Sequence, residues 1–135
     1  MSAKASADRI ADLRQRRRDM RRELARVRWW RRLVAARREL TVAALARPDG
    51  GEGLGLEAAW EALAADAPTS RELEAAVWPE RTRVTPGSIE GLDMLDARLD
   101  TYEARVAENL ETVTAQMVKV MGEAHRQDVA ERRYA

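Results

Sequence analysis

The sequence predicts an all-α protein built on two long helices, and three observations support this fold class. No glycine or proline occurs before Pro48, so one helix of about 40 residues can form there. Glycine and proline concentrate in the middle third, and apolar residues recur at helical spacing on both sides of it. We expect long helices at 6–46 and 88–133, forming an antiparallel coiled-coil hairpin or bundle, and short helices at 56–66 and 70–78. Its 135 residues suit a single helical domain.

The first long helix is expected to begin at Ser6, whose hydroxyl can cap the first turn. Its apolar residues follow the alternating three- and four-residue steps of a coiled coil: Ile10, Leu13, Met20, Leu24, Val27 and Val34. The same register places three basic residues on this seam: Arg17, Arg31 and Arg38. A second apolar stripe indicates a second neighbour, and its members are Trp30, Leu33, Leu40 and Ala44.

The connection between the long helices begins with a glycine-rich stretch, residues 48–55, which lacks the Lys-Ser/Thr of a phosphate-binding loop. Thr69 and Glu72 have the spacing of a capping box, which predicts the start of the second short helix. The residues expected on the buried side of this helix are Leu73, Val77 and Trp78.

The last helix is expected to begin at Ser88 as its N-cap. Its first apolar residues form a regular seam of Leu92, Leu95, Leu99, Tyr102 and Val106. Further along, the seam is expected to drift, as in a straight helix, to Leu110, Val113, Met117, Val120 and Ala124.

Charge is distributed unevenly, although the net charge of the whole chain is only +1. Residues 1–47 carry 15 basic and 5 acidic side chains, whereas residues 48–87 have a net charge of −5 and residues 88–135 one of −4. The basic first third can be neutralised within the fold, across a dimer or by an acidic partner protein. Binding to nucleic acid is the alternative interpretation.

Several classes of function lack the residues that they require. The chain has no cysteine and a single histidine, His125, so no His-based triad or thiolate metal site is expected, and we predict a protein that is not an enzyme. No apolar run reaches the length of a membrane span, and the first residues lack the apolar core of a signal peptide. We therefore expect no membrane association and a cytoplasmic location. The abundance of Ala, Arg and Glu suggests a GC-rich, actinobacterial genome.

The two adjacent tryptophans, Trp29 and Trp30, cannot both point into one seam, because neighbouring residues diverge by about 100° around a helix. One of them is expected to be part of the core. The other either covers the short helices or remains exposed as an anchor for a partner, since Trp is frequent among residues that dominate binding energy.

Residues 28–40 resemble the signature helix of the actinobacterial anti-sigma factors of the RsiG type. Members of that family are helical coiled-coil hairpins that hold a WhiG-class sigma factor inactive, using cyclic di-GMP bound to the coiled coil. Their Glu, Ser, Arg, Gln, Asp motif falls here on Leu24, Arg28, Arg31, Ala35 and Glu39. Arg31 matches and Glu39 is similar to the acid. The resemblance implies a sigma-factor binder that acts without the nucleotide, and a homodimer is consistent with dimeric members of the family.

The predicted site therefore lies on the first long helix. The residues expected to contact a protein partner are Arg28, Trp29, Trp30, Arg32, Leu33, Arg37 and Leu40. Arg31 and Glu39 are the candidate nucleotide-binding residues, and no catalytic or metal-binding residue is assigned. Two alternatives remain: a basic-helix protein that binds nucleic acid or organises the nucleoid, and a structural helical homo-oligomer.

Overall fold

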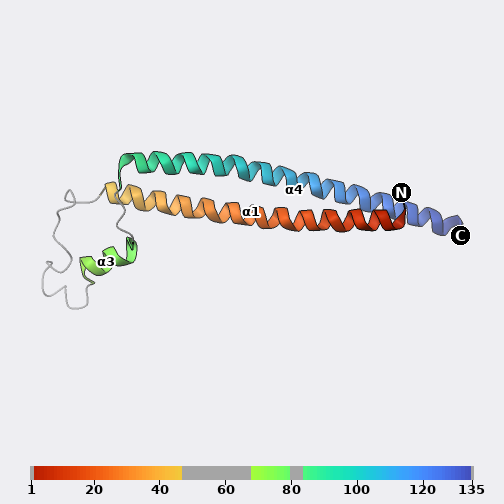
Figure 1. The fold of residues 1–135 in the computed structure, drawn as a ribbon, viewed down its shortest axis with the longest axis horizontal. Helices are drawn as coiled ribbons and strands as arrows, with labels where there is room; N and C mark the ends of the chain where they lie inside the picture. Colours follow the sequence, from red (N-terminus) through yellow and green to blue (C-terminus); the bar gives the residue numbers. More distant parts are fainter. Residues whose placement is uncertain (1, 47–67, 80–83, 135) are drawn as a thin grey trace. The chain divides into compact units, whose positions relative to one another are not determined.

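A computed structural model of the chain describes residues 2–46, 68–79 and 84–134, and these residues form helices without strands (Figure 1). The helices are α1 (Ala3–Leu45), α3 (Ser70–Val77) and α4 (Pro86–Tyr134). The prediction of two long helices and a short one at 70–78 is thereby confirmed, whereas the predicted helix at 56–66 lies outside the described residues. None of the helices in the described part combines the length and apolar character that crossing a membrane requires.

The chain divides into two compact units, each of which takes part of both long helices. The first unit comprises Met1–Ala35 and Met94–Ala135, and the second comprises Ala36–Asp93. The single domain expected from the sequence stays a prediction.

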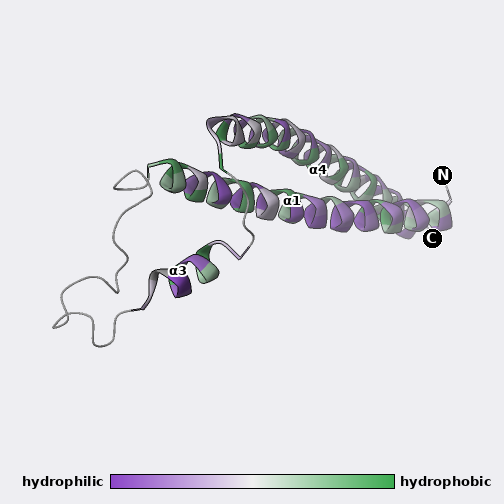
Figure 2. Cartoon of the chain, turned by 60° about the vertical axis from the view of Figure 1, so that its left-hand side comes forward, coloured by the Kyte–Doolittle hydropathy of each residue, from purple (hydrophilic) through white to green (hydrophobic). Residues whose placement is uncertain are grey.

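The first unit is held together by a narrow apolar seam between α1 and α4. Its core is a cluster of buried residues against which Ile10 packs: Leu13, Val113, Met117 and Val120. Val27 and Val106 are also buried, at 4% and 5% exposed. Hydrophilic residues dominate the middle of α1 (Figure 2), so few side chains are available for this seam. The spacing of the seam on α1 is as predicted.

The seam of α4 differs from the prediction in its first half. Leu95 and Tyr102 were expected to be core residues, but they are 46% and 41% exposed. Asp96 and Glu103 take the inward positions instead, and both are half-buried. With these acids included, the inward residues keep regular coiled-coil spacing, without drift, along Asp96, Leu99, Glu103, Val106, Leu110, Val113, Met117, Val120 and Ala124. These acids lie opposite Arg31, which α1 presents to the same seam, and their carboxylates pair with its half-buried guanidinium.

The caps of the long helices also differ from the prediction. Helix α1 begins three residues before Ser6, where the Ser2 hydroxyl accepts a hydrogen bond from the Ala5 amide at 3.2 Å. Ser6 is buried instead. At the start of α4, Ser88 lies within the first turn and its hydroxyl accepts from the Thr85 amide at 3.2 Å. Proline is favoured at the first helical position, so Pro86 starts the helix before Ser88.

The second unit contains the end of α1, helix α3 and the start of α4. The predicted cap of α3 is confirmed, since the Thr69 hydroxyl accepts a hydrogen bond from the Glu72 amide at 3.1 Å. Leu73 and Val77 were expected to be buried, but they are 41% and 44% exposed. A helix of eight residues has little surface to bury. Trp78, which follows α3, is half-buried, and the Arg37 guanidinium of α1 lies over its ring.

Candidate protein-binding surface

The tryptophan pair on α1 is exposed, contrary to the expectation that one ring belongs to the core. Trp29 is 47% and Trp30 48% exposed. The two rings meet edge to face, with centroids 4.8 Å apart and planes at 69°. This geometry is favourable for aromatic pairs and limits the rotation of both rings. The pair therefore presents a large, pre-ordered apolar surface.

Exposed apolar residues of α4 lie on the same side of the first unit as Trp30. The hydroxyl of Tyr102 donates a hydrogen bond to the carboxylate of Glu23 across the seam, at 2.9 Å. Glu23 precedes Trp30 by seven residues and Leu95 precedes Tyr102 by seven, which places each pair on one side of its helix. Together with the exposed Leu33, they form what we call the apolar face, defined as Trp29, Trp30, Leu33, Leu95 and Tyr102.

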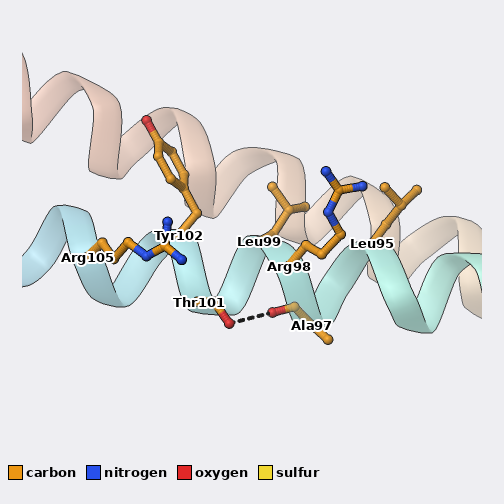
Figure 3. Close-up of a pocket in the computed structure, with 7 residues that line it drawn as sticks. All are labelled: Leu95, Ala97, Arg98, Leu99, Thr101, Tyr102 and Arg105. Carbon is orange, nitrogen blue, oxygen red and sulfur yellow. Dashed lines mark hydrogen bonds between the residues drawn. The ribbon is translucent and has the colours of Figure 1, made fainter.

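A shallow hollow of about 620 Å³ lies at the α4 side of this face (Figure 3). Leu95, Leu99 and Tyr102 project into it from one side of α4, whereas Thr101 turns away and donates to the Ala97 carbonyl at 3.1 Å. The remaining lining side chains are Arg98 and Arg105. Neither guanidinium has an acidic partner in the described part of the chain. The hollow thus combines apolar walls with two uncompensated positive charges.

The hydrogen bond between Tyr102 and Glu23 also stabilises the protonated form of the Tyr102 phenol. It raises the pKa of Tyr102 above its ordinary value, because the bonded carboxylate favours the protonated phenol, and partial desolvation acts in the same direction. A phenol with a raised folded pKa stabilises the fold at pH values below about 10. This contribution is lost as the pH rises through the folded pKa.

We therefore expect Tyr102→Phe to lower stability slightly at pH 8 and to make no difference at a pH above the folded pKa. Urea unfolding of both proteins at the two pH values tests the stability effect. The chain has only two tyrosines, so the difference in phenolate absorbance between wild type and variant reports the titration of Tyr102 directly. A midpoint for Tyr102 at or below the ordinary value would contradict the hydrogen bond.

Arg31 lies at the centre of a network of carboxylates contributed by α4. Its guanidinium is 3.1 Å from the Asp96 carboxylate, 3.0 Å from that of Asp100 and 3.5 Å from that of Glu103. The hydrogen bond to Asp96 is the largest cause that raises the pKa of Arg31, followed by the charges of the acids against an opposing effect of desolvation. The Arg31 guanidinium is therefore occupied by contacts within the chain and is not free to bind a ligand.

Three of the five positions of the family motif, Arg28, Arg31 and Ala35, line one hollow of about 690 Å³. It is lined by Ala25, Arg28, Arg31, Arg32, Ala35, Asp96 and Glu103. Arg32 is exposed, and Arg28 makes only a loose ion pair with Glu103, at 3.7 Å. The two carboxylates in the wall pair with Arg28 and Arg31, so two of its three guanidiniums are engaged by acids of the chain. The other candidate nucleotide ligand, Glu39, is exposed and does not line this hollow.

Two residues of the predicted partner site belong to the second unit. The guanidinium of Arg37 lies 5.2 Å from the centroid of the Trp78 ring, a cation–π contact, and Leu40 is half-buried. The predicted site is therefore divided, and only its Trp29, Trp30 and Leu33 part belongs to the apolar face. Sequence reasoning missed the α4 half of the face, because Leu95 and Tyr102 were assigned to the core.

The remaining candidates are a metal site and the single histidine. Across residues 2–46, 68–79 and 84–134, no three His, Cys, Asp or Glu side chains are placed to hold a metal ion. His125 is exposed near the end of α4.

Comparison of the chain with protein-family models, with curated proteins and with solved structures gives no match. The function is accordingly inferred from the residues of the chain and their geometry.

Proposed function

We propose that this chain is a non-enzymatic regulatory protein that binds a partner protein through the apolar face, in the manner of the anti-sigma factors that it resembles. The two long helices act as an antiparallel coiled-coil hairpin in the cytoplasm, and the partner is a sigma factor. The observation that carries this proposal is the exposed, edge-to-face pair of Trp29 and Trp30 beside Leu33, Leu95 and Tyr102.

Exposed apolar surface of this kind favours association. Contiguous apolar patches on soluble proteins mark interaction sites more often than isolated apolar residues do. Trp, Tyr and Arg are the residues that contribute most to binding energy in interfaces, and all three types are present on this face or in its hollow. The unpaired Arg98 and Arg105 favour a partner surface that carries acidic side chains beside its apolar ones.

The arrangement of Arg31 supports binding without cyclic di-GMP. Its hydrogen bonds to Asp96 and Asp100 occupy the guanidinium, and the neighbouring carboxylates repel phosphate. We expect calorimetric titration with cyclic di-GMP to show no saturable binding. Saturable binding that Arg31→Ala removes would instead assign the nucleotide to this hollow and overturn the nucleotide-independent form of the proposal.

The proposal is tested by measuring the affinity of the purified chain for a WhiG-class sigma factor from the same genome. Trp30→Ala is expected to weaken binding by about 30-fold or more, which corresponds to the roughly 2 kcal/mol typical of a dominant interface residue. Val129→Ala is the matched control, because Val129 is 49% exposed on α4 and does not belong to the apolar face. Helical circular dichroism confirms that both variants fold.

Each outcome of this experiment has a defined meaning. No affinity of the wild type for the sigma factor rejects the anti-sigma function, and equal affinity of wild type and Trp30→Ala rejects the role of the tryptophan. Light scattering addresses the homo-oligomer alternative. A dimer that Trp30→Ala dissociates would assign the apolar face to a second copy of the chain.

A further inference from the structure

Two groups of arginines on α1 differ in their contacts. The group nearer the end of α1 makes ion pairs with α4: Arg28 and Arg31 reach carboxylates of the first unit, and Arg38 reaches Asp93 in the second unit. The other group comes earlier in the chain, is called the first group, and contains six arginines within nine residues: Arg14, Arg16, Arg17, Arg18, Arg21 and Arg22. None of these six makes an ion pair with an acid of residues 2–46, 68–79 or 84–134. Within the described residues, Arg18 donates a hydrogen bond to the uncharged side chain of Gln15.

Arg17 and Arg31 make the contrast specific, because both occupy equivalent seam positions of α1, two heptads apart. Arg31 has three carboxylates within 4 Å, whereas the buried Nε–H of Arg17 has no hydrogen-bond acceptor within the described part of the chain. A buried donor without an acceptor is costly and rare in folded proteins. Arg17 thus lacks the carboxylate partners that Arg31 has at the equivalent seam position.

The first group also has the geometry of a continuous binding surface. Arg14, Arg17, Arg18 and Arg21 follow the i, i+3, i+4, i+7 spacing of one side of a helix. They span about 10 Å along the helix axis, close to three base-pair steps of a duplex. A hollow of about 410 Å³ opens beside them and is lined by Arg17, Arg21, Leu110, Glu111, Thr114 and Ala115. The Glu111 carboxylate is exposed and makes no ion pair with either arginine in the described structure.

We propose that residues 14–22 form a second binding surface, for the phosphate backbone of nucleic acid, in which Arg14, Arg17, Arg18 and Arg21 contact phosphates. Guanidinium groups bind phosphate oxygens through two parallel hydrogen bonds, and the exposed side chains of Arg14, Arg18 and Arg21 can offer such donors to solvent. Met20 is the only apolar residue in this stretch and is half-buried. Interfaces with nucleic acid are polar and basic, whereas the centres of protein interfaces are depleted of charge, so the surface suits a phosphate backbone better than an acidic protein.

This surface is independent of the apolar face. The two share no residue, and the proposal for residues 14–22 holds whether or not the chain binds a sigma factor. Trp30→Ala is accordingly expected to leave nucleic-acid binding unchanged.

The test is the fluorescence anisotropy of a labelled 20-base-pair duplex DNA titrated with the full chain at 50 mM and 200 mM NaCl. About four phosphate contacts, each contributing a slope of about −0.9 in log K against log salt, predict a loss of affinity on the order of 100-fold between the two concentrations. The triple variant Arg14→Gln, Arg17→Gln, Arg21→Gln is expected to bind more weakly and to lose only about fourfold across the same range.

A second triple variant, Arg98→Gln, Arg105→Gln, Arg126→Gln, removes the same charge from α4 and is expected to leave most of the affinity and of the salt dependence intact. No binding of wild type at 50 mM NaCl, or equal weakening by both triple variants, would overturn the proposal. Competition by polyglutamate as effective as that by DNA of equal charge would also overturn it, in favour of an acidic protein. Circular dichroism and urea unfolding of each variant verify that the helices remain intact.

Discussion

Leu13→Ala is expected to lower the free energy of unfolding of the first unit by about 2–4 kcal/mol. Leu13 is 4% exposed and packs against Val113, Met117 and Val120. Truncation removes the transfer free energy of the lost methyl groups and leaves a cavity, because the surrounding side chains relax only partly. Among the described residues, Ile10 is the partly buried hydrophobic that packs against this cluster.

Urea unfolding followed by helical circular dichroism measures this effect. Val118→Ala is the matched control, since Val118 is next to the buried Met117 but is 63% exposed. Its loss of stability should be within about 0.5 kcal/mol, and the higher helix propensity of alanine can make it slightly stabilising. Equal losses for the two variants would show that Leu13 is not a core residue.

The large expected effect at Leu13 reflects how few residues hold the first unit together. Only six hydrophobic side chains of the described residues are buried, and four of them form one cluster. The same scarcity explains why the sequence predicted the seam of α1 correctly. Leu13 and Val27 lie two heptads apart, and only one line of apolar residues on α1 connects them at alternating three- and four-residue steps. The same spacing places Arg31 on the seam.

The seam of α4 was mispredicted because two overlapping lines share Leu99. One line runs through Leu95 and Tyr102, and the other through Asp96 and Glu103. Apolarity alone favours the first line, and the structure adopts the second. The inward acids pair with Arg31 of the other helix, and a single-helix pattern does not contain that information.

The same choice creates the candidate site. Because Asp96 and Glu103 turn inward, Leu95 and Tyr102 turn outward beside the tryptophans. Sequence reasoning identified Trp29 and Trp30 as candidate anchors but could not determine their exposure, which depends on which side of each helix the seam occupies. The fold class could be predicted from the periodicity of each helix. The apolar face depends on the charged layer, by which we mean Arg31 and the acids that it contacts, Asp96, Asp100 and Glu103.

The contacts of Arg31 with the α4 acids lead to the second prediction: Arg31→Glu is expected to destabilise the first unit more than a neutral substitution at this position, and its effect should depend on pH. The substitution places a fourth carboxylate beside Asp96, Asp100 and Glu103, which lie within 3.5 Å of the present guanidinium. Like charges raise the folded pKa of carboxylates above the unfolded values near 4. The folded variant then binds more protons than the unfolded chain, so its stability falls as the pH rises through this range.

Urea unfolding at pH 4.5 and pH 7.5 tests this prediction. The deficit of Arg31→Glu relative to wild type should be larger at pH 7.5, where the carboxylates are ionised, and smaller at pH 4.5. Arg31→Leu is the matched control, because it removes the guanidinium without adding a charge and should show a weaker pH dependence. A deficit of Arg31→Glu that is the same at both pH values would mean that the acids are not coupled to this position.

Exchange of the two charges separates the ion pair from other effects of the substitution. Asp96→Arg in the background of Arg31→Glu restores an opposite-charge pair at the seam, so the double variant should be more stable than the sum of the two single losses predicts. If the losses simply add, the contact between Arg31 and Asp96 contributes nothing specific, and the inward turn of Asp96 needs another cause. If the exchange rescues stability, the charged layer sets the register of α4 and thereby exposes Leu95 and Tyr102 on the apolar face.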